Sequence, residues 1–398
     1  MSGVWSKAPR LPRLARTGWA LGTASSWRAR GFPRLLPINV TVSTNFRCNF
    51  KCATCNVYER KVVELEAEEW AKVFKSLGKS PAWMTFSGGE PFLRKDLPDI
   101  ILSAVRYCRP SVLTIPTNGW FTDRVVNGSE RICKEAPDTQ LKINLSIDHN
   151  DPHRHDEIRG APGSWDRLMV TLERLRALNL PNLTIGVHTV ISRENDQDFP
   201  GIANGLAKLG ADSYIAECAE ERVELQTMEL GIGPKADRFR RAATSVLAVD
   251  AEANGGVARI VRALRGEYYG RVARLLEGDE TAMPVCHAGF LSTHLTAEGE
   301  VWSCCVLARS FGNLRDTDFD FRPIWFSEEA GKFRQWMRER RCACPLANAA
   351  YTNLMAEPLA VGRVALGLTK KRTISDAAST ENGNGNQLAP SVHGVSRP

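Results

Sequence analysis

Long apolar runs are missing from this chain of 398 residues. The two longest, at residues 15–24 and 354–368, are interrupted by charge, proline or glycine and fall short of the roughly 20 apolar residues that a bilayer requires. No internal repeat is found, and no apolar signal-peptide core precedes a clear cleavage site. We therefore expect a soluble, cytoplasmic protein without a transmembrane segment, long enough for one large domain and a smaller one.

Acidic residues are missing from the first 58 positions, which hold nine Lys or Arg. The rest of the chain carries 43 basic and 45 acidic residues and is close to neutral. Trp5, Trp19 and Trp27 stand between the arginines, so this basic arm would suit an anionic membrane surface or nucleic acid. The favoured interpretation is simpler, a poorly ordered extension over residues 1–37.

Cysteine is plentiful, with eleven residues, but its distribution argues against a secreted disulfide scaffold. Eight of the eleven fall into two groups, residues 48–55 and 286–344, which favours metal ligation in a reducing compartment. Cys108 and Cys133 lie in amphipathic helical patterns and read as ordinary buried thiols.

Apolar runs typical of strands alternate with helical patterns through the first half of the chain. The expected strands are residues 39–43, 83–86, 112–115, 141–147, 183–191 and 213–216. Helical spacing fills 67–77, 97–108, 164–178 and 196–209 between them. This order predicts parallel strands with right-handed crossovers, hence an α/β barrel or open sheet whose chemistry lies at the carboxyl ends of the strands.

The first cysteine group has the spacing CxxxCxxC, at Cys48, Cys52 and Cys55. Thiolates suit iron-sulfur clusters and zinc alike, but this spacing is not a usual zinc spacing. Three thiolates would leave one iron of a [4Fe–4S] cube open. Phe46 and Phe50 are available to shield such a cluster.

Three further motifs follow at strand ends. Residues 88–91 read Gly-Gly-Glu-Pro, where glycines allow close backbone approach and Glu90 can accept from an ammonium group. Ser146 and Asp148 alternate along one strand and would present a hydroxyl and a carboxylate to the same side. Asn118 follows the third strand, and Arg159 is placed to pair with a carboxylate.

Together these motifs resemble those of the radical S-adenosylmethionine (radical SAM) superfamily over roughly residues 38–220. The resemblance implies a partial (β/α)6 barrel that binds S-adenosylmethionine at the open iron and cleaves it to a 5′-deoxyadenosyl radical. The residues that it assigns to this cofactor are Gly88, Gly89, Glu90, Pro91, Asn118, Ser146, Asp148 and Arg159. One departure is Thr54 before Cys55, where the family usually has an aromatic residue near adenine.

The second group, with Cys286, Gly299 and Cys304, matches the CX9–15GX4C signature of SPASM and twitch extensions. A hairpin is expected at residues 291–295 and 301–306, followed by a helix at 333–340. With Cys342 and Cys344 the resemblance implies one auxiliary [4Fe–4S] cluster. The chain departs from the family in having CxC at residues 342–344 where CxxC is usual. Cys305 stands beside Cys304, so which of the two is the ligand stays open. A zinc ribbon is the alternative to an auxiliary cluster.

The predicted domains are a basic extension (1–37), the barrel (38–220), a helical bridge (221–285), the auxiliary cluster domain (286–350), and a C-terminal helix with a disordered tail (351–398). The candidate catalytic residues in the barrel lumen are His188, Glu217 and Cys218. Glu217 would act as a base and Cys218 as a hydrogen-atom donor.

The leading hypothesis is an oxidoreductase or maturase acting on a small carbohydrate-like molecule or a peptide, with flavodoxin or ferredoxin as electron donor. No winged-helix pattern precedes Cys48, which tilts the expectation slightly toward a small molecule. The alternatives are an RNA-modifying radical SAM enzyme that uses the basic arm, for which nucleic acid is the less favoured partner, and a zinc-stabilised binding module without enzymatic activity.

Overall fold

A single nine-stranded sheet organises the protein. The computed structural model describes residues 11–250, 256–339 and 342–369. Six parallel strands form the core, and all six lie where the sequence predicts them: β1 (Asn39–Asn45), β2 (Trp83–Gly88), β3 (Val112–Thr117), β4 (Gln140–Ser146), β5 (Leu183–Ile191) and β6 (Ser213–Cys218). Their spatial order follows the sequence. The predicted partial (β/α)6 barrel is confirmed.

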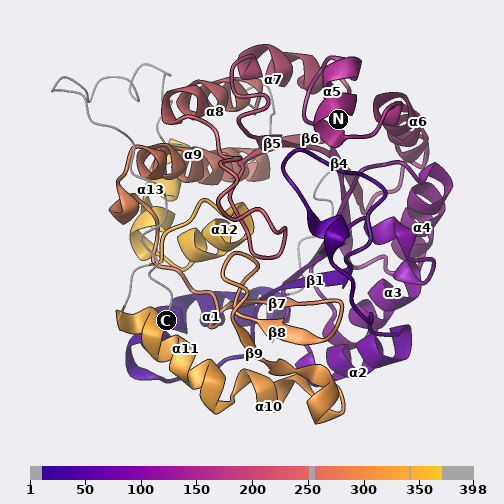
Figure 1. The fold of residues 1–398 in the computed structure, drawn as a ribbon. Coiled ribbons are helices and arrows are strands. Elements are labelled where there is room, and N and C mark those ends of the chain that lie inside the picture. Colours follow the sequence, from indigo (N-terminus) through magenta and orange to yellow (C-terminus); the bar gives the residue numbers. More distant parts are fainter. Residues whose placement is uncertain (1–10, 251–255, 340–341, 370–398) are drawn as a thin grey trace, which may run out of the picture.

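Helices cover the outer face of these strands in an arc that runs from α2 to α8 (Figure 1). Four were predicted: α2 (Ala67–Leu77), α3 (Leu97–Cys108), α6 (Ser164–Ala177) and α7 (Phe199–Ala207). Two were missed, α4 (Thr122–Glu135) and the short α5 (Pro152–Arg159). Their apolar sides pack on the strands in one continuous core, which leaves the inner side of the sheet for a cavity.

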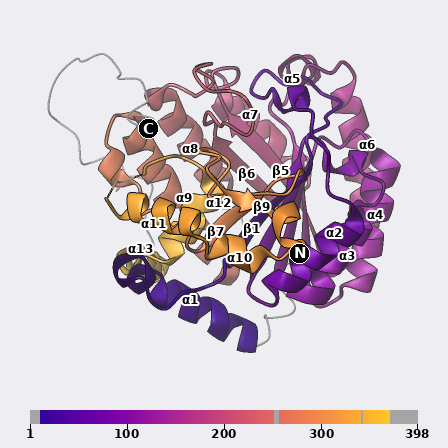
Figure 2. The ribbon, with the colours of Figure 1, turned by 60° about the horizontal axis from the view of Figure 1, so that its bottom comes forward.

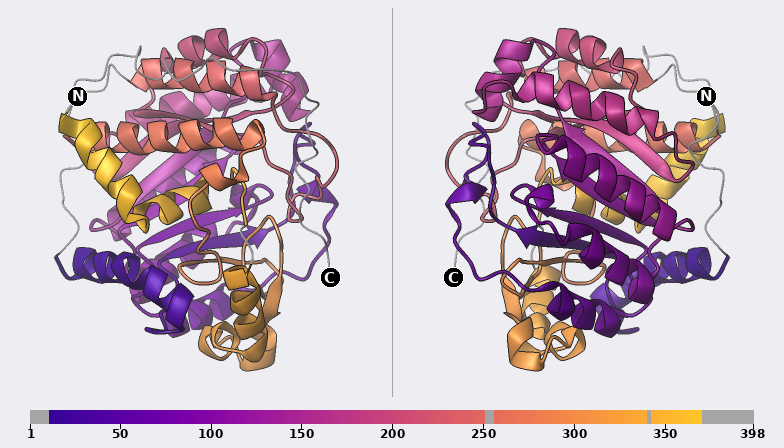
Figure 3. Two further views of the ribbon diagram at one scale, coloured as in Figure 1. Left: turned by 90° about the vertical axis from the view of Figure 1, so that its left-hand side faces the viewer. Right: turned by 90° about the vertical axis from the view of Figure 1, so that its right-hand side faces the viewer.

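The bridge consists of α8 (Ala236–Asp250) and α9 (Gly256–Leu276), as expected. The predicted hairpin then forms from β7 (Ser292–Leu295) and β8 (Glu300–Trp302), and β9 (Ser310–Asn313) adds a further antiparallel strand. This hairpin is not separate from the barrel, because β7 pairs in parallel with β1, with Asn39 opposite Ser292. The strands of both parts run through one sheet in the side views of Figure 3.

Short helices close the carboxyl-terminal part: α10 (Phe321–Trp325), α11 (Glu328–Glu339), α12 (Ala347–Met355) and α13 (Pro358–Thr369). The predicted helix at residues 333–340 corresponds to α11. None of the described helices is both long and apolar enough to cross a bilayer. The tail that was predicted to be disordered from residue 370 lies outside the described residues.

The amino-terminal arm is not a loose extension over its described part. It forms α1 (Leu11–Arg30), which lies along the bottom of the molecule in Figure 2. Trp27 is 2% exposed and packs edge-on against Phe290 and Trp325. Arg28 donates a hydrogen bond to the carbonyl of Cys286 (2.9 Å). The expectation of disorder is therefore wrong for residues 11–30, because apolar burial offsets the loss of chain entropy.

Candidate active site

The loop after β1 carries Cys48, Cys52 and Cys55, all half-buried and all lining one large cavity. Backbone contacts fix this loop. The Phe50 N–H donates to the sulfur of Cys48 (3.4 Å), and the Ala53 N–H donates to the carbonyl of Ile158 in α5 (2.8 Å). Three thiols are thus presented from a short, anchored loop at the carboxyl end of a strand.

The surroundings of these thiols fit a metal cluster better than free thiols. Burial raises the pKa of Cys48 and of Cys55 to about 12, so an uncompensated thiolate is disfavoured there. The guanidinium of Arg159 lies 3.9 Å from the sulfur of Cys52 and supplies positive charge. Phe46 packs with Cys48 and Cys55 on the inner side, as the shielding prediction requires.

The spacing of the sulfurs argues against zinc. Metal–sulfur bonds of about 2.3 Å place the ligands of one zinc ion about 3.8 Å apart. Within the described parts of the chain, three His, Cys, Asp or Glu ligand atoms lie within 4.8 Å of one another only at Glu224, His294 and Cys305. Neither cysteine group meets that limit among the described residues. An arrangement wider than a single zinc site is compatible with a multi-iron cluster, whose irons separate the thiolates.

Gly88 and Gly89 allow the chain's own backbone to pass closely. A Cβ at Gly88, whose φ is +133°, would lie 2.0 Å from the carbonyl oxygen of Asn45, and one at Gly89 would lie 2.1 Å from that of Arg47. The Gly89 N–H donates to the Asn45 carbonyl (3.0 Å). The glycines therefore hold the loop after β2 against the cysteine loop.

Glu90 anchors two strand ends. Its carboxylate accepts hydrogen bonds from the Phe92 N–H (3.0 Å), the Thr117 hydroxyl (2.8 Å) and the Asn118 N–H (2.8 Å). Burial raises the pKa of Glu90 to about 7, against these three bonds. The following Pro91 is buried and begins a 3-10 turn. Glu90 and Asn118 both line the cavity.

Asp148 and Arg159 form a buried ion pair of 3.0 Å. Asp148 also accepts from the Val190 N–H (2.9 Å), and its own N–H donates to Nδ1 of His155. Ser146 ends β4 and lines the cavity, whereas Asp148 lies two residues beyond and does not. The two side chains therefore do not both face the cavity, in contrast to the prediction that they present a hydroxyl and a carboxylate to one ligand. Asp148 instead holds Arg159 beside Cys52.

The cavity has a volume of about 1990 Å³ and occupies the inner side of the sheet. Glu217 faces it and pairs with His188 at 3.3 Å. Burial opposes ionisation of Glu217, but the His188 imidazole holds its pKa below the usual value. Cys218, the next residue on β6, belongs to the hydrophobic core, and its thiol donates to the Ala219 carbonyl. Both residues line the cavity, but Cys218 is almost fully buried and its thiol is already hydrogen-bonded, so the geometry favours Glu217.

The second cysteine group gathers around a separate small pocket. Its lining includes all four predicted ligands, Cys286, Cys304, Cys342 and Cys344, but not Cys305. A hydrogen bond from Cys342 lowers the pKa of Cys286 to about 7. Cys304 also lines the large cavity, so the two cysteine groups open onto one chamber.

Several charged residues of the chamber were missed from the sequence. Glu220, Arg222 and Glu224 lie in the loop after β6 and line the cavity, and Arg222 pairs with Glu220. His294 on β7 contacts Glu224 at 3.3 Å. Part of this result could have been predicted, because polar residues that follow a parallel strand lie at the catalytic end of the sheet.

Two separate segments of the chain match known family models. Residues 42–206 match the radical SAM superfamily, and residues 286–345 match the SPASM iron-sulfur cluster-binding domain. This chain is a radical SAM enzyme with a SPASM domain. The predicted resemblance is confirmed, and the alternative of a non-enzymatic zinc module is wrong. A radical SAM enzyme of this kind binds [4Fe–4S] clusters, one of them auxiliary, and S-adenosylmethionine.

The radical SAM enzyme is similar to proteins named PqqA peptide cyclase. The one from Streptomyces rochei is 27% identical over 87% of this chain and 93% of its own length. The one from Granulibacter bethesdensis is 29% identical, over 44% of this chain and 45% of its own length. Among solved structures, Streptococcus suis SuiB bound to its precursor peptide SuiA shares the fold, with a TM-score of 0.58, 15% identity, and 84% and 76% of the two chains covered.

Proposed function

We propose that this radical SAM enzyme removes hydrogen from a carbon of a peptide substrate held in the chamber between its two cysteine groups. The carrying observation is the chamber itself. Its volume of about 1990 Å³ would be shared by the first cluster and S-adenosylmethionine, and it is large enough to leave room beside them for a peptide segment. The names of the similar peptide cyclases support the same substrate class. The slight tilt toward a small molecule is thereby reversed.

We assign the radical cluster to Cys48, Cys52 and Cys55, and the auxiliary cluster to Cys286, Cys304, Cys342 and Cys344. Bound together, the first cluster and S-adenosylmethionine supply a 5′-deoxyadenosyl radical that takes a hydrogen atom from substrate.

The chain's own residues orient and shield this chemistry. Glu90 retains acceptor capacity on the oxygen that faces Asn118, and this capacity suits an ammonium group. Arg159, held by Asp148, offers positive charge beside Cys52. Ser146 and Asn118 add a hydroxyl and an amide to the same wall. These four residues, with Gly88, Gly89, Pro91 and Asp148 behind them, form the proposed cofactor site.

Glu217 is the proposed base for the substrate. It faces the chamber, and His188 on the neighbouring strand holds its carboxylate in place and ionised. An ionised carboxylate accepts the proton released when a substrate radical is oxidised. Cys218 also lines the chamber and is retained only as a less favoured hydrogen-atom donor, because it is buried and its thiol donates to the Ala219 carbonyl. The auxiliary cluster, held by its four cysteines, would supply a one-electron acceptor for the substrate radical. A flavodoxin or ferredoxin would be the electron donor that the first cluster needs.

The test has two parts. After anaerobic reconstitution, wild type and a Cys48→Ala/Cys52→Ala/Cys55→Ala variant are compared for iron, sulfide and dithionite-driven release of 5′-deoxyadenosine. The variant is expected to lose the iron and sulfide of one cluster and all release of 5′-deoxyadenosine.

The second part tests the substrate class. A pool of synthetic peptides and a pool of amino sugars are incubated with wild type. Loss of two hydrogen atoms from peptides only supports the proposal, and loss from sugars only overturns it.

A further inference from the structure

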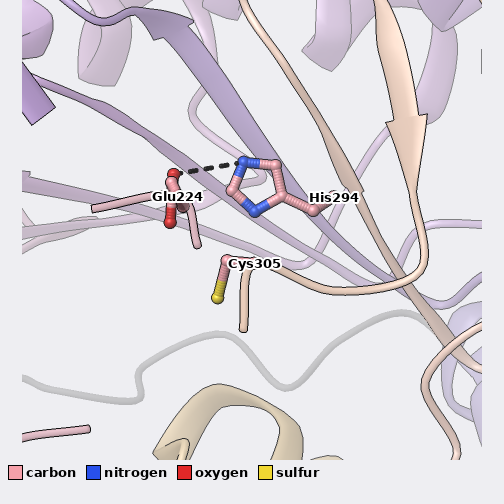
Figure 4. A group of neighbouring side chains, drawn as sticks. All are labelled: Glu224, His294 and Cys305. Carbon is pink, nitrogen blue, oxygen red and sulfur yellow. Dashed lines mark ion pairs between the residues drawn. The ribbon is translucent and has the colours of Figure 1, made fainter. Parts of the chain in front are cut away.

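A compact group of possible metal ligands lies in the wall of the chamber, next to the second cysteine group, from which it takes Cys305. It consists of Glu224, His294 and Cys305, whose ligand atoms all lie within 4.8 Å of one another (Figure 4). The residues come from three separate segments: the loop after β6, strand β7 and the loop after β8. All three are buried, with exposed fractions of 4%, 2% and 7%, and all three line the cavity.

His294 has an unused ring nitrogen at this place. Its Nε2 lies 3.3 Å from Oε1 of Glu224 and 2.8 Å from the hydroxyl of Ser43. Its Nδ1 is buried and has no hydrogen-bond partner, and it is the nitrogen nearer Cys305 in Figure 4. A buried nitrogen without a partner is costly unless something binds it. Ring nitrogens that bind metals commonly have the other ring N–H held by a hydrogen-bond acceptor. Here the Ser43 hydroxyl lies 2.8 Å from Nε2 and itself donates to Oε1 of Glu224, which leaves Nδ1 and Oε2 for a ligand.

The charges nearby also suit a divalent cation. Arg222 is the neighbouring cation, and it pairs with Glu220 and lies 4.0 Å from Glu224. The carboxylates of Glu220 and Glu224 bring two negative charges to this wall, and Arg222 is the cation that pairs with the first and lies near the second. A divalent ion would add positive charge beside Glu224 and could hold the Cys305 sulfur as a ligand.

Cys305 is free to serve this group. The small pocket of the second cysteine group is lined by Cys304 and not by Cys305. Two consecutive cysteines thus face two different places, one the auxiliary cluster and the other the chamber wall. This arrangement explains the spare thiol that the sequence left unassigned.

We propose that Glu224, His294 and Cys305 bind a Zn²⁺ ion in the chamber wall. One sulfur, one imidazole nitrogen and one carboxylate oxygen form a donor set that zinc accepts. Ligand atoms of a tetrahedral zinc site lie about 3.5 Å apart, so a group within 4.8 Å needs shifts of only about 1 Å. Three protein ligands leave a fourth position toward the cavity. If the proposed peptide function holds, that position takes an oxygen or sulfur donor of the substrate.

Metal analysis of the full-length protein tests the site without relying on activity. Wild type is reconstituted anaerobically with iron and sulfide, supplied with zinc sulfate, and desalted. Zinc and iron are then counted by mass spectrometry. We expect one zinc per chain in wild type and in the control Cys133→Ser, which removes a buried thiol far from this group. We expect at least a tenfold lower zinc content in Cys305→Ser and Glu224→Gln, with iron unchanged.

Zinc absorption spectroscopy of wild type identifies the ligands directly, even where a variant fails to fold. A single sulfur scatterer together with nitrogen or oxygen scatterers supports the site. Three or four sulfur scatterers would place zinc in a cysteine group and overturn it. A loss of one cluster's iron in Cys305→Ser would make Cys305 a cluster ligand and equally overturn it. Release of 5′-deoxyadenosine is scored separately, so failure of the zinc site and failure of the proposed function remain distinguishable.

Discussion

Replacing Gly160 by alanine tests how the cysteine loop is held. Gly160 ends α5 in the left-handed region, with φ +59°, and a Cβ there would lie 2.2 Å from the carbonyl oxygen of Lys51. Lys51 stands between Cys48 and Cys52. A side chain at Gly160 therefore has to displace the backbone of the loop that carries the proposed cluster ligands.

Gly163 provides the matched control. It also adopts a positive φ, +79°, but a Cβ there would meet nothing within 4 Å. Gly163→Ala bears only the left-handed strain, about 1–2 kcal/mol. Gly160→Ala adds an overpacking cost of about 1–3 kcal/mol, giving a total of about 2–5 kcal/mol.

The assay combines denaturant unfolding with iron and sulfide content after anaerobic reconstitution. We expect Gly163→Ala to retain the full iron content of wild type. Gly160→Ala should unfold at lower denaturant and lose the iron of the radical cluster while keeping that of the auxiliary cluster. Equal iron content and equal stability of the two variants would refute the idea that this close contact positions the loop.

Three further outcomes are expected. Arg159→Met leaves the buried carboxylate of Asp148 unpaired and should lower the free energy of unfolding by about 3–5 kcal/mol. The double variant Arg159→Met/Asp148→Asn should regain part of this loss. A double variant no more stable than Arg159→Met would contradict the prediction. Glu90 has a pKa of about 7 in the folded state, above its ordinary 4.5, so between these values the folded chain binds a proton that the unfolded chain has lost. The free energy of unfolding should therefore fall by up to about 3 kcal/mol as pH rises toward 7, and level off above it. Glu90→Gln should flatten that slope in denaturant unfolding between pH 5.5 and 8, and an unchanged slope would argue against it. Trp27→Ala should cost about 3–5 kcal/mol, seen in the same unfolding assay, and a cost below about 1 kcal/mol would show that α1 is not docked in solution.

The architecture was predictable because its signals are local. Each of the six core strands is a short apolar run, and the turn residues between runs mark the ends. α5 was missed because its sequence, PHRHDEIR, has little apolar periodicity. α1 was read as disordered because its charged residues are all basic and it lies in an arm without acidic residues. Its docking depends on Trp27 meeting Phe290, a partner far away in the sequence.

The site was predictable in its motifs but not in its contacts. The cysteine spacings indicate ligand sets, yet no spacing shows that Asp148 turns toward Arg159. Nor does a spacing show that Cys304 lines both pockets while Cys305 lines only the large one. The glycines at residues 88 and 89 were expected to admit a ligand. The structure adds that they admit the backbone of residues 45–47, a contact between two loops that a single sequence does not reveal.

Strand β1 connects the two proposed cluster sites mechanically. On one side it pairs with β2, whose end carries Gly88 and Glu90, and on the other side with β7, which opens the auxiliary hairpin. Ser43 near the end of β1 contacts both Glu224 and His294, and the cysteine loop begins a few residues later. Because hydrogen-bonded strands keep a fixed register, the ends of β1 and β7, which stand beside the two proposed cluster sites, are held relative to each other within one sheet. A substrate held in the chamber would therefore contact two walls that belong to one rigid sheet.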